Sequence, residues 1–219
     1  DHGVGLHNHP FPYITIIISG GYWETDKNKN KTNPSNKKPS SNSPIPSKQE
    51  IKEAVKMVST EEIMPHFSEG KFGIKPDGSL QTSADLAAQK KLQNILQDIY
   101  PAPFLGEEMS TFEQKRLLSS ANEFLWCVDP IDGTSNYVNG IPYFAVSVAL
   151  MKKGRTLIGV VYDPAREEMF SAEVGSGAYL NGVELLQRRK VKSIDHAIAQ
   201  IDFKRLPPKI SEVLLLNPP

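Results

Sequence analysis

The chain contains very little cysteine and no long run of apolar residues. Cys127 is the only cysteine among 219 residues, which excludes an internal disulfide and favours a reducing compartment such as the cytoplasm. Apolar stretches such as Ile14 to Ile18, which contains Thr15, are much shorter than the roughly 20 residues that cross a bilayer. We therefore expect neither a membrane span nor a secretory signal peptide.

The chain also lacks a net excess of charge. Lysine and arginine together number 25, and aspartate and glutamate also number 25. A balanced chain has no overall field that would attract a nucleic-acid polymer or an acidic membrane surface. Functional acids must therefore be recognised locally, from their spacing and their neighbours.

The composition divides the chain into zones. Residues 1–24 are apolar and aromatic, with a predicted strand at 13–18. Residues 25–47 are almost entirely Lys, Asn, Ser, Pro and Thr, and Ile45 is their only large apolar side chain. Such a segment buries too little apolar surface to offset its ordering entropy. We interpret it as a low-complexity linker that leads to a packed domain at 48–205, with a short truncated tail at 206–219.

The first zone contains two histidines separated by one residue, His7 and His9. Side chains two apart on a strand point the same way and could share a metal ion. The pattern faintly resembles the metal-binding strand of cupin-type β-barrels, but the glutamate usual in that family is absent. An end piece without a function of its own is the simpler interpretation.

Two helices are predicted at the start of the packed domain. Ser47 and Glu50 have the spacing of a capping box, and Pro65 should end or kink the helix that they begin. Four apolar residues on one face of this helix are Ile51, Ala54, Val55 and Val58. A second helix should begin near Ser83 and stop before Pro101. Its apolar face consists of Leu92, Ile95, Leu96 and Ile99.

Downstream of the helices the apolar period changes to two. Strands are predicted at 104–105, 124–128, 144–151, 156–162 and 168–174. Lys153 and Gly154 form a predicted hairpin turn, so at least part of the sheet should be antiparallel. Two helices followed by a meander of strands indicate an α+β fold.

One predicted strand ends in a run of chemically unusual residues, WCVDPIDGTSNY at 126–137. Pro130 fixes φ and forces a turn, which could bring Asp129, Asp132 and the Ile131 carbonyl to one side. Oxygen ligands of this kind suit Mg²⁺. Gly133 then permits a close backbone approach, and the helix predicted to open at residue 134 would offer N–H groups to an anion. One interpretation is therefore a metal site beside a phosphate cradle.

The other interpretation is an ordinary turn, because Asp-Pro and Asp-Gly are common turn pairs. Asp163 and Pro164 are expected to form just such a turn. Further acids favour the site: Glu107 and Glu108 follow a short strand, and Asp85 lies in the first turn of the second helix. Each of these also has a plain alternative, a helix-dipole charge for Asp85 and a solvated surface turn for the glutamates.

The order of these acids resembles the inositol monophosphatase family of Mg²⁺-dependent, lithium-sensitive phosphatases. The resemblance covers residues 48–205 and rests on four segments: TSAD (82–85), LGEE (105–108), WCVDPIDGTSNYVNGIPYFAVSVAL (126–150) and IGVVYDPAREEMFSAEVGSGAYLNG (158–182). It implies the N-terminal layers, two helices and a mainly antiparallel sheet, of an α-β-α-β-α sandwich whose C-terminal half is missing here. It also suggests a homodimer.

The resemblance implies a metal-binding role for each matching oxygen ligand. Glu107, Asp129 and the Ile131 carbonyl would bind a first Mg²⁺, and Asp129 and Asp132 a second. Asp85 would take part in catalysis by serving a weaker metal site through water. Two metal ions that brace an in-line attack by water need no phospho-enzyme intermediate.

The resemblance also implies how the substrate is handled. Thr134, together with Glu107, would orient and help deprotonate the attacking water, and the backbone amides of Gly133 and Thr134 would hold the phosphate. Ser135 stands where 3′-phosphoadenosine 5′-phosphate nucleotidases commonly have lysine. Inositol 1-phosphate is therefore the first expected substrate among small phosphorylated metabolites. 3′-Phosphoadenosine 5′-phosphate and fructose 1,6-bisphosphate stay open, as does a non-catalytic role in binding metal and phosphate.

The chain departs from the family in one metal ligand. The family completes its second metal site with an aspartate in a Trp-Asp pair, whereas Trp23 precedes Glu24 and Trp126 precedes Cys127 here. We interpret the chain as a fragment with a weakened second Mg²⁺ site and little or no activity of its own.

The sheet carries two further expectations. Without the second half of the fold, the side chains of Val146, Val148 and Leu150 should be exposed and prone to association. Cys127, inside a strand with no histidine nearby in sequence, should be a small buried side chain rather than a nucleophile.

Overall fold

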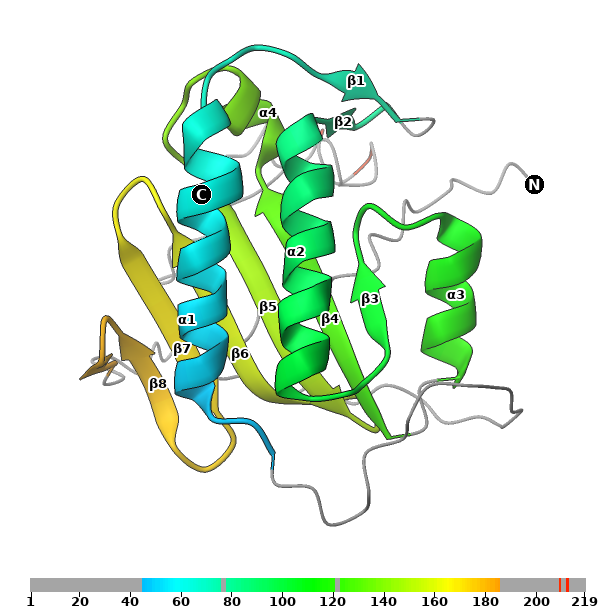
Figure 1. Ribbon diagram of the computed structural model, residues 1–219, viewed down its shortest axis with the longest axis vertical. Helices are drawn as coiled ribbons and strands as arrows, with labels where there is room; N and C mark the ends of the chain where they lie inside the picture. The colour runs from blue at the N-terminus through cyan, green and yellow to red at the C-terminus, as the bar shows by residue number, and fades with distance from the viewer. Residues whose placement is uncertain (1–44, 76–77, 121–122, 186–208, 210–211, 213–219) are drawn as a thin grey trace. The chain divides into compact units, whose positions relative to one another are not determined.

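The computed structural model describes residues 45–75, 78–120 and 123–185, together with positions 209 and 212 (Figure 1). The first zone, nearly all of the linker and nearly all of the chain beyond residue 185 lie outside the described residues, and so does the predicted His7–His9 pair. The helices and strands from Lys48 to Glu184 belong to one compact unit.

The first helix, α1 (Lys48–Val58), begins as its sequence predicts. Ser47 and Glu50 form the capping box: the Ser47 hydroxyl accepts from the Glu50 amide at 3.3 Å, and the Glu50 carboxylate accepts from the Ser47 amide at 2.9 Å. All four predicted apolar positions are buried. The helix ends at Val58, and a π turn (Ser59–Ile63) and a 3₁₀ turn that contains Pro65 (Met64–His66) follow it.

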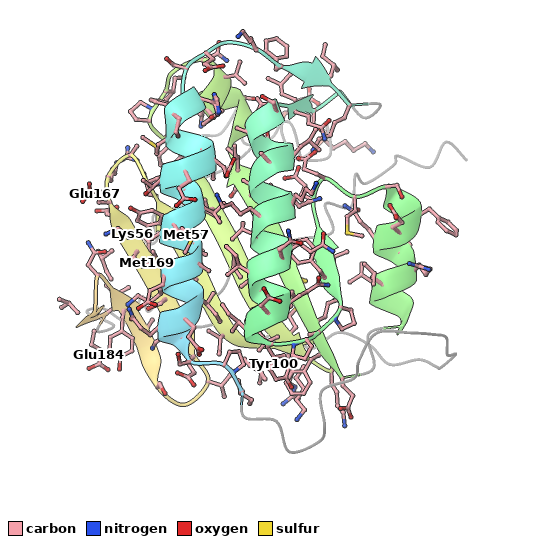
Figure 2. The ribbon with its side chains drawn as sticks, in the orientation of Figure 1. Lys56, Met57, Tyr100, Glu167, Met169 and Glu184 are labelled. Atoms are coloured by element: carbon pink, nitrogen blue, oxygen red, sulfur yellow. The ribbon has the colours of Figure 1, made fainter. Side chains whose placement is uncertain are left out.

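The second helix, α2 (Ser83–Ile99), is capped by Thr82 and Asp85. Leu92 and Leu96 are fully buried in the main core, and Ile95 and Ile99 pack against it. The helix ends at Tyr100, whose extended backbone conformation precedes Pro101; Figure 2 shows Tyr100 at this end of α2. No helix in the described part of the chain is long and apolar enough to cross a membrane.

Seven strands form the main sheet, in the order β3-β4-β5-β6-β7-β8-β9. Their bounds are β3 Phe104–Gly106, β4 Phe124–Asp132, β5 Ala145–Lys152, β6 Arg155–Asp163, β7 Glu168–Glu173, β8 Gly177–Leu180 and β9 Val183–Glu184. β3 and β4 are parallel, and the other neighbouring pairs are antiparallel. Lys153 and Gly154 turn the chain from β5 to β6, both with positive φ, as predicted for the hairpin.

Several elements were not predicted from the sequence. A two-stranded ribbon pairs β1 (Gly73–Ile74) with β2 (Leu80–Gln81). α3 (Thr111–Ser120) follows β3, and β8 and β9 extend the sheet. The short α4 (Thr134–Val138) begins at the residue expected to open a helix.

α1 and α2 cover one face of the main sheet (Figure 1). The main core lies between them and the strands, and Figure 2 shows Met169 of β7 near Lys56 and Met57 of α1.

Cys127, on β4, belongs to a smaller buried cluster with Leu105 and Ala149. It is 4% exposed and burial raises the pKa of its thiol to about 12, which confirms its expected inert character.

The prediction that Val146, Val148 and Leu150 lie exposed was wrong. These three side chains are at most 1% exposed, because they point from β5 into the main core under the helices. Alternation along a strand assigns the intervening residues to the other face. Ser147 and Ala149 are the small residues found there.

The functional residues gather at one end of the sheet. β3 and β4 run in the same direction and finish at the end where α2 begins (Figure 1). α4 and the β1–β2 ribbon lie at that same end. Because parallel strands bring their carboxyl ends together, residues just after β3 and at the end of β4 become neighbours.

Candidate metal and phosphate site

β4 carries two of the predicted metal ligands near its carboxyl end. Asp129 lies opposite Ser147 of β5 and Asp132 opposite Ala145, and the register shifts between the two pairs. In a regular strand, side chains three residues apart point to opposite faces. The irregularity around Pro130 re-aims one of them, as bulges beside active sites commonly do. The turn predicted from Asp-Pro is thus a bulge within the strand.

Asp129 is buried among other acids. Its Oδ1 accepts a hydrogen bond from the Ile131 amide at 3.1 Å. Burial raises the pKa of Asp129 well above its ordinary value, and the charges of Glu107 and Asp132 raise it further. A hydrogen bond to Glu107 acts in the same direction. The site therefore favours a proton or a cation between these carboxyl groups.

Glu107 reaches Asp129 because of the parallel strand pair. Gly106 of β3 lies opposite Val128 of β4, and the Glu107 amide then donates to the Val128 carbonyl at 3.1 Å. The Gln114 side chain of α3 donates to the Glu107 carbonyl at 2.9 Å. The backbone of Glu107 is thereby held beside the end of β4.

Asp85 approaches from the first turn of α2 and has two unlike oxygens. Oδ2 accepts from the Thr82 amide at 2.7 Å and from the Thr82 hydroxyl at 2.5 Å. Oδ1 is buried and has no hydrogen-bond partner. Burial raises the pKa of Asp85 to about 6, the Thr82 hydrogen bonds oppose this, and the charges of Glu108 and Glu107 add to it. The helix-cap role is real, but it leaves one oxygen for another partner.

Gly133 and Thr134 join the end of β4 to α4. Gly133 has φ +97°, and a Cβ there would lie 3.1 Å from the Tyr143 carbonyl oxygen. Both the backbone conformation and the close contact therefore favour glycine at this position. The Thr134 hydroxyl donates to the Ile131 carbonyl at 3.0 Å. The Asn136 side chain ties α4 to the same segment by donating to the Tyr143 carbonyl at 2.8 Å.

Lys75 also enters the site, and sequence reasoning missed it. The ammonium lies 2.7 Å from Glu108 and 3.2 Å from Glu107. Burial lowers the pKa of Lys75, but the hydrogen bond to Glu108 and the charges of both glutamates outweigh it and raise the pKa overall. In the sequence, only the position of Lys75 directly after Ile74 could have drawn attention to it. In the structure, this position lies at the turn of the β1–β2 ribbon.

The acidic side chains at this end of the sheet suit a hard cation, although they are not arranged around a common point. In the described segments, no three His, Cys, Asp or Glu side chains are positioned to hold one metal ion together. The acids nevertheless offer only oxygen, repel one another at Asp129 and leave Asp85 Oδ1 unsatisfied. Oxygen-rich sites of this kind suit Mg²⁺. The individual ligand roles remain predictions.

Known proteins are similar to this chain in sequence and in fold. The model of the inositol monophosphatase family matches residues 47–206. Nus factor SuhB from Pasteurella multocida is 37% identical over 117 residues, 53% of this chain and 42% of that relative. The structure of an IMPase from Thermotoga maritima has a TM-score of 0.52 at 30% identity, covering 63% of this chain and 50% of that one. An inositol monophosphatase–fructose 1,6-bisphosphatase has a TM-score of 0.53 at 27% identity, covering 63% and 53%.

A helix-covered mixed sheet with acids at one end is thus the N-terminal part of a layered α+β phosphatase fold. The family model matches most of the chain, so the chain belongs to the inositol monophosphatase family. It spans about half the length of the known proteins that it matches.

Proposed function

We propose that this chain contributes the metal and phosphate site of a Mg²⁺-dependent phosphomonoesterase. The observation that carries the proposal is the buried Asp129, whose pKa is raised by burial and by the neighbouring charges of Glu107 and Asp132. Three acids held together at that cost are stabilised most directly by a divalent cation.

The proposed ligand assignment is the one that the family resemblance implies. Glu107, Asp129 and the Ile131 carbonyl would hold a first Mg²⁺, and Asp129 and Asp132 a second. Asp85 is 0% exposed and keeps Oδ1 unpaired, so it serves a further, weaker ion through water. Bound Mg²⁺ would lower the pKa of a water molecule and offset charge on the phosphate.

Thr134 and Gly133 handle the reacting groups. The Thr134 hydroxyl gives its hydrogen to Ile131, so its lone pairs accept a hydrogen bond from the attacking water and, with Glu107, aim it. The Gly133 and Thr134 amides, at the start of α4, bind the phosphate oxygens. These roles agree with glycine at a position where a Cβ would meet the backbone of Tyr143.

We propose a small phosphorylated metabolite as the substrate, with inositol 1-phosphate first. Ser135 after Thr134, in place of a lysine, supports this choice over 3′-phosphoadenosine 5′-phosphate. Fructose 1,6-bisphosphate is the next candidate, since one similar structure is named for both activities. Lithium sensitivity is part of the same proposal, supported by a staphylococcal inositol monophosphatase described as a LiCl-soaked inhibitory complex.

A non-catalytic role in binding metal and phosphate is the second candidate. It is favoured by acids that do not form a complete ligand set in the described region. Such a chain would bind Mg²⁺ and phosphate without turnover.

The deciding experiment combines calorimetry with a phosphate-release assay. Mg²⁺ should bind the wild-type chain and not Asp129→Asn, and inorganic phosphate should bind only when Mg²⁺ is present. Lithium-sensitive release of phosphate from inositol 1-phosphate then identifies the enzyme, and binding without release identifies the second candidate. Absence of Mg²⁺ binding by the wild-type chain would refute both.

A further inference from the structure

Glu108 differs from its neighbour Glu107 in that its side chain has no exposed surface. The Glu108 side chain is 0% exposed and that of Glu107 is 14% exposed. Both face the Lys75 ammonium, which lies 2.7 Å from Glu108 and 3.2 Å from Glu107. One positive charge is therefore shared between two carboxylates, and the shorter contact is to the buried one.

Both oxygens of Glu108 already have protein partners. Lys75 donates to Oε1, and the Gln81 side chain donates to Oε2. The Glu108 amide donates to the Gln89 side chain of α2 at 2.8 Å. A Cβ on Gly106 would lie 2.2 Å from that same Gln89 oxygen, so the glycine makes room for this contact. The Glu108 carboxylate is thus held by groups from β2 and the ribbon turn, and the Glu108 backbone by a group from α2.

We propose that Glu108 is a positioning residue that holds the Lys75 ammonium and thereby keeps Glu107 available as a metal ligand. This inference rests on the proposed function and goes beyond it, because Glu108 acts through Lys75 and binds no metal itself. A buried ammonium without its own counter-ion pairs fully with the next carboxylate. That carboxylate is Glu107, and a cation would then have to displace the lysine to bind it.

Removing the charge of Glu108 should therefore weaken metal binding through Lys75. In Glu108→Gln we expect the Mg²⁺ dissociation constant to rise about tenfold, as for outer residues that orient metal ligands. Adding Lys75→Met to Glu108→Gln removes the competing ammonium. We expect the double variant to bind Mg²⁺ within about threefold of Lys75→Met alone. If Glu108→Gln weakened Mg²⁺ binding by a loss of packing, Lys75→Met would not restore it. Restored binding in the double variant therefore indicates that the Lys75 charge causes the loss.

Calorimetric titration of Mg²⁺ into the full chain tests the inference. Glu53→Gln, an exposed charge change on α1, is the matched control and should leave the affinity unchanged. Gln81→Met removes a hydrogen bond to the Glu108 carboxylate without altering any charge, and it should weaken Mg²⁺ binding about threefold. This variant replaces Glu108→Gln in the test if Glu108→Gln does not fold. Wild-type affinity in Gln81→Met and Glu108→Gln, or a double variant no better than Glu108→Gln, overturns the role of Glu108. A wild-type chain that binds no Mg²⁺ overturns the proposed function as well.

Discussion

The chain contains two Asp-Pro turns that look alike in sequence and differ in what surrounds the aspartate. Asp163 Oδ1 accepts from the amides of Ala165 and Arg166, both at 3.0 Å, and Oδ2 lies 2.5 Å from the Arg166 guanidinium. Asp129 receives one backbone hydrogen bond and is otherwise surrounded by acids. The turn at Asp163 thus contains its own counter-ion. The segment at Asp129 calls for a cation from outside the protein.

The largest expected effect is the loss of Mg²⁺ binding in Asp129→Asn. Asp129 is the ligand proposed for both ions, so its Mg²⁺ affinity should fall about 1,000-fold, more than for changes to residues that only orient ligands. Asp163→Asn, the same change in the other turn, should leave the affinity as in the wild-type chain. Calorimetry on both variants measures the contrast. Equal losses in the two variants would remove the distinction between the turns.

Asp85→Asn should stabilise the metal-free fold at neutral pH. The folded-state pKa of Asp85 is raised from 3.8 to about 6, so the folded chain holds this proton more tightly than the unfolded chain. Stability is therefore lost as the pH rises from about 4 through 6, and the loss is complete above that window. The variant should gain up to about 3 kcal/mol at pH 7.5 and nothing below about pH 4.

Urea unfolding in EDTA at several pH values measures this gain. Asp98→Asn, an acid exposed on the same helix, is the control and should show no such pH-dependent difference. A gain that stays constant from pH 4 to 7.5 would contradict the assignment of the effect to the buried Asp85 charge.

Gly133→Ala tests the close backbone approach that follows the Asp129 segment and not the Asp163 turn. The substituted residue would keep φ near +97° and place its Cβ 3.1 Å from the Tyr143 carbonyl oxygen. We expect a loss of about 2 kcal/mol of unfolding free energy, and weaker phosphate binding in the folded variant. Gly154→Ala has φ +77° and no atom within 4 Å, so it should lose only about 1 kcal/mol. Equal losses of unfolding free energy in the two variants would mean that the positive φ alone accounts for the need for glycine at position 133.

The smallest expected effect is that of Arg166→Gln in the Asp163 turn. The Arg166 side chain is 45% exposed, and exposed ion pairs contribute less than about 1 kcal/mol and are screened by salt. The unfolding free energy should fall by no more than that at low salt and by less at high salt. Mg²⁺ affinity should not change. Any loss of Mg²⁺ binding would show that this turn also serves the metal site.

Much of the helical structure could be predicted because its signals are local. The capping residues of α1 and the apolar faces of α1 and α2 were found from spacing alone, and the structure confirms them. α3 was not predicted, because its exposed Phe112 and Leu118 interrupt any apolar stripe. The exposed edge strand β9 has only two residues, too few to show a period.

The two faces of β5 could not be distinguished from the sequence. Val146, Val148 and Leu150 alternate correctly, but alternation does not say which face the helices cover. The prediction placed them on the open side, and the structure buries them. In the candidate site, the acids were found from their order, whereas Lys75 was missed because it lies 32 residues from Glu107 along the chain.

By itself, the sequence determined α1, α2, the strands β3 to β7 and the identity of the acidic residues, because caps, apolar periods and short motifs are local features. Only the tertiary structure decided that, among the described residues, the charges near Asp129 are those of other acids, whereas Asp163 pairs with Arg166, and that Lys75 lies between Glu107 and Glu108. Electrostatic environment depends on burial and on groups within a few ångströms. Strand pairing and helix packing bring those groups together from distant parts of the chain.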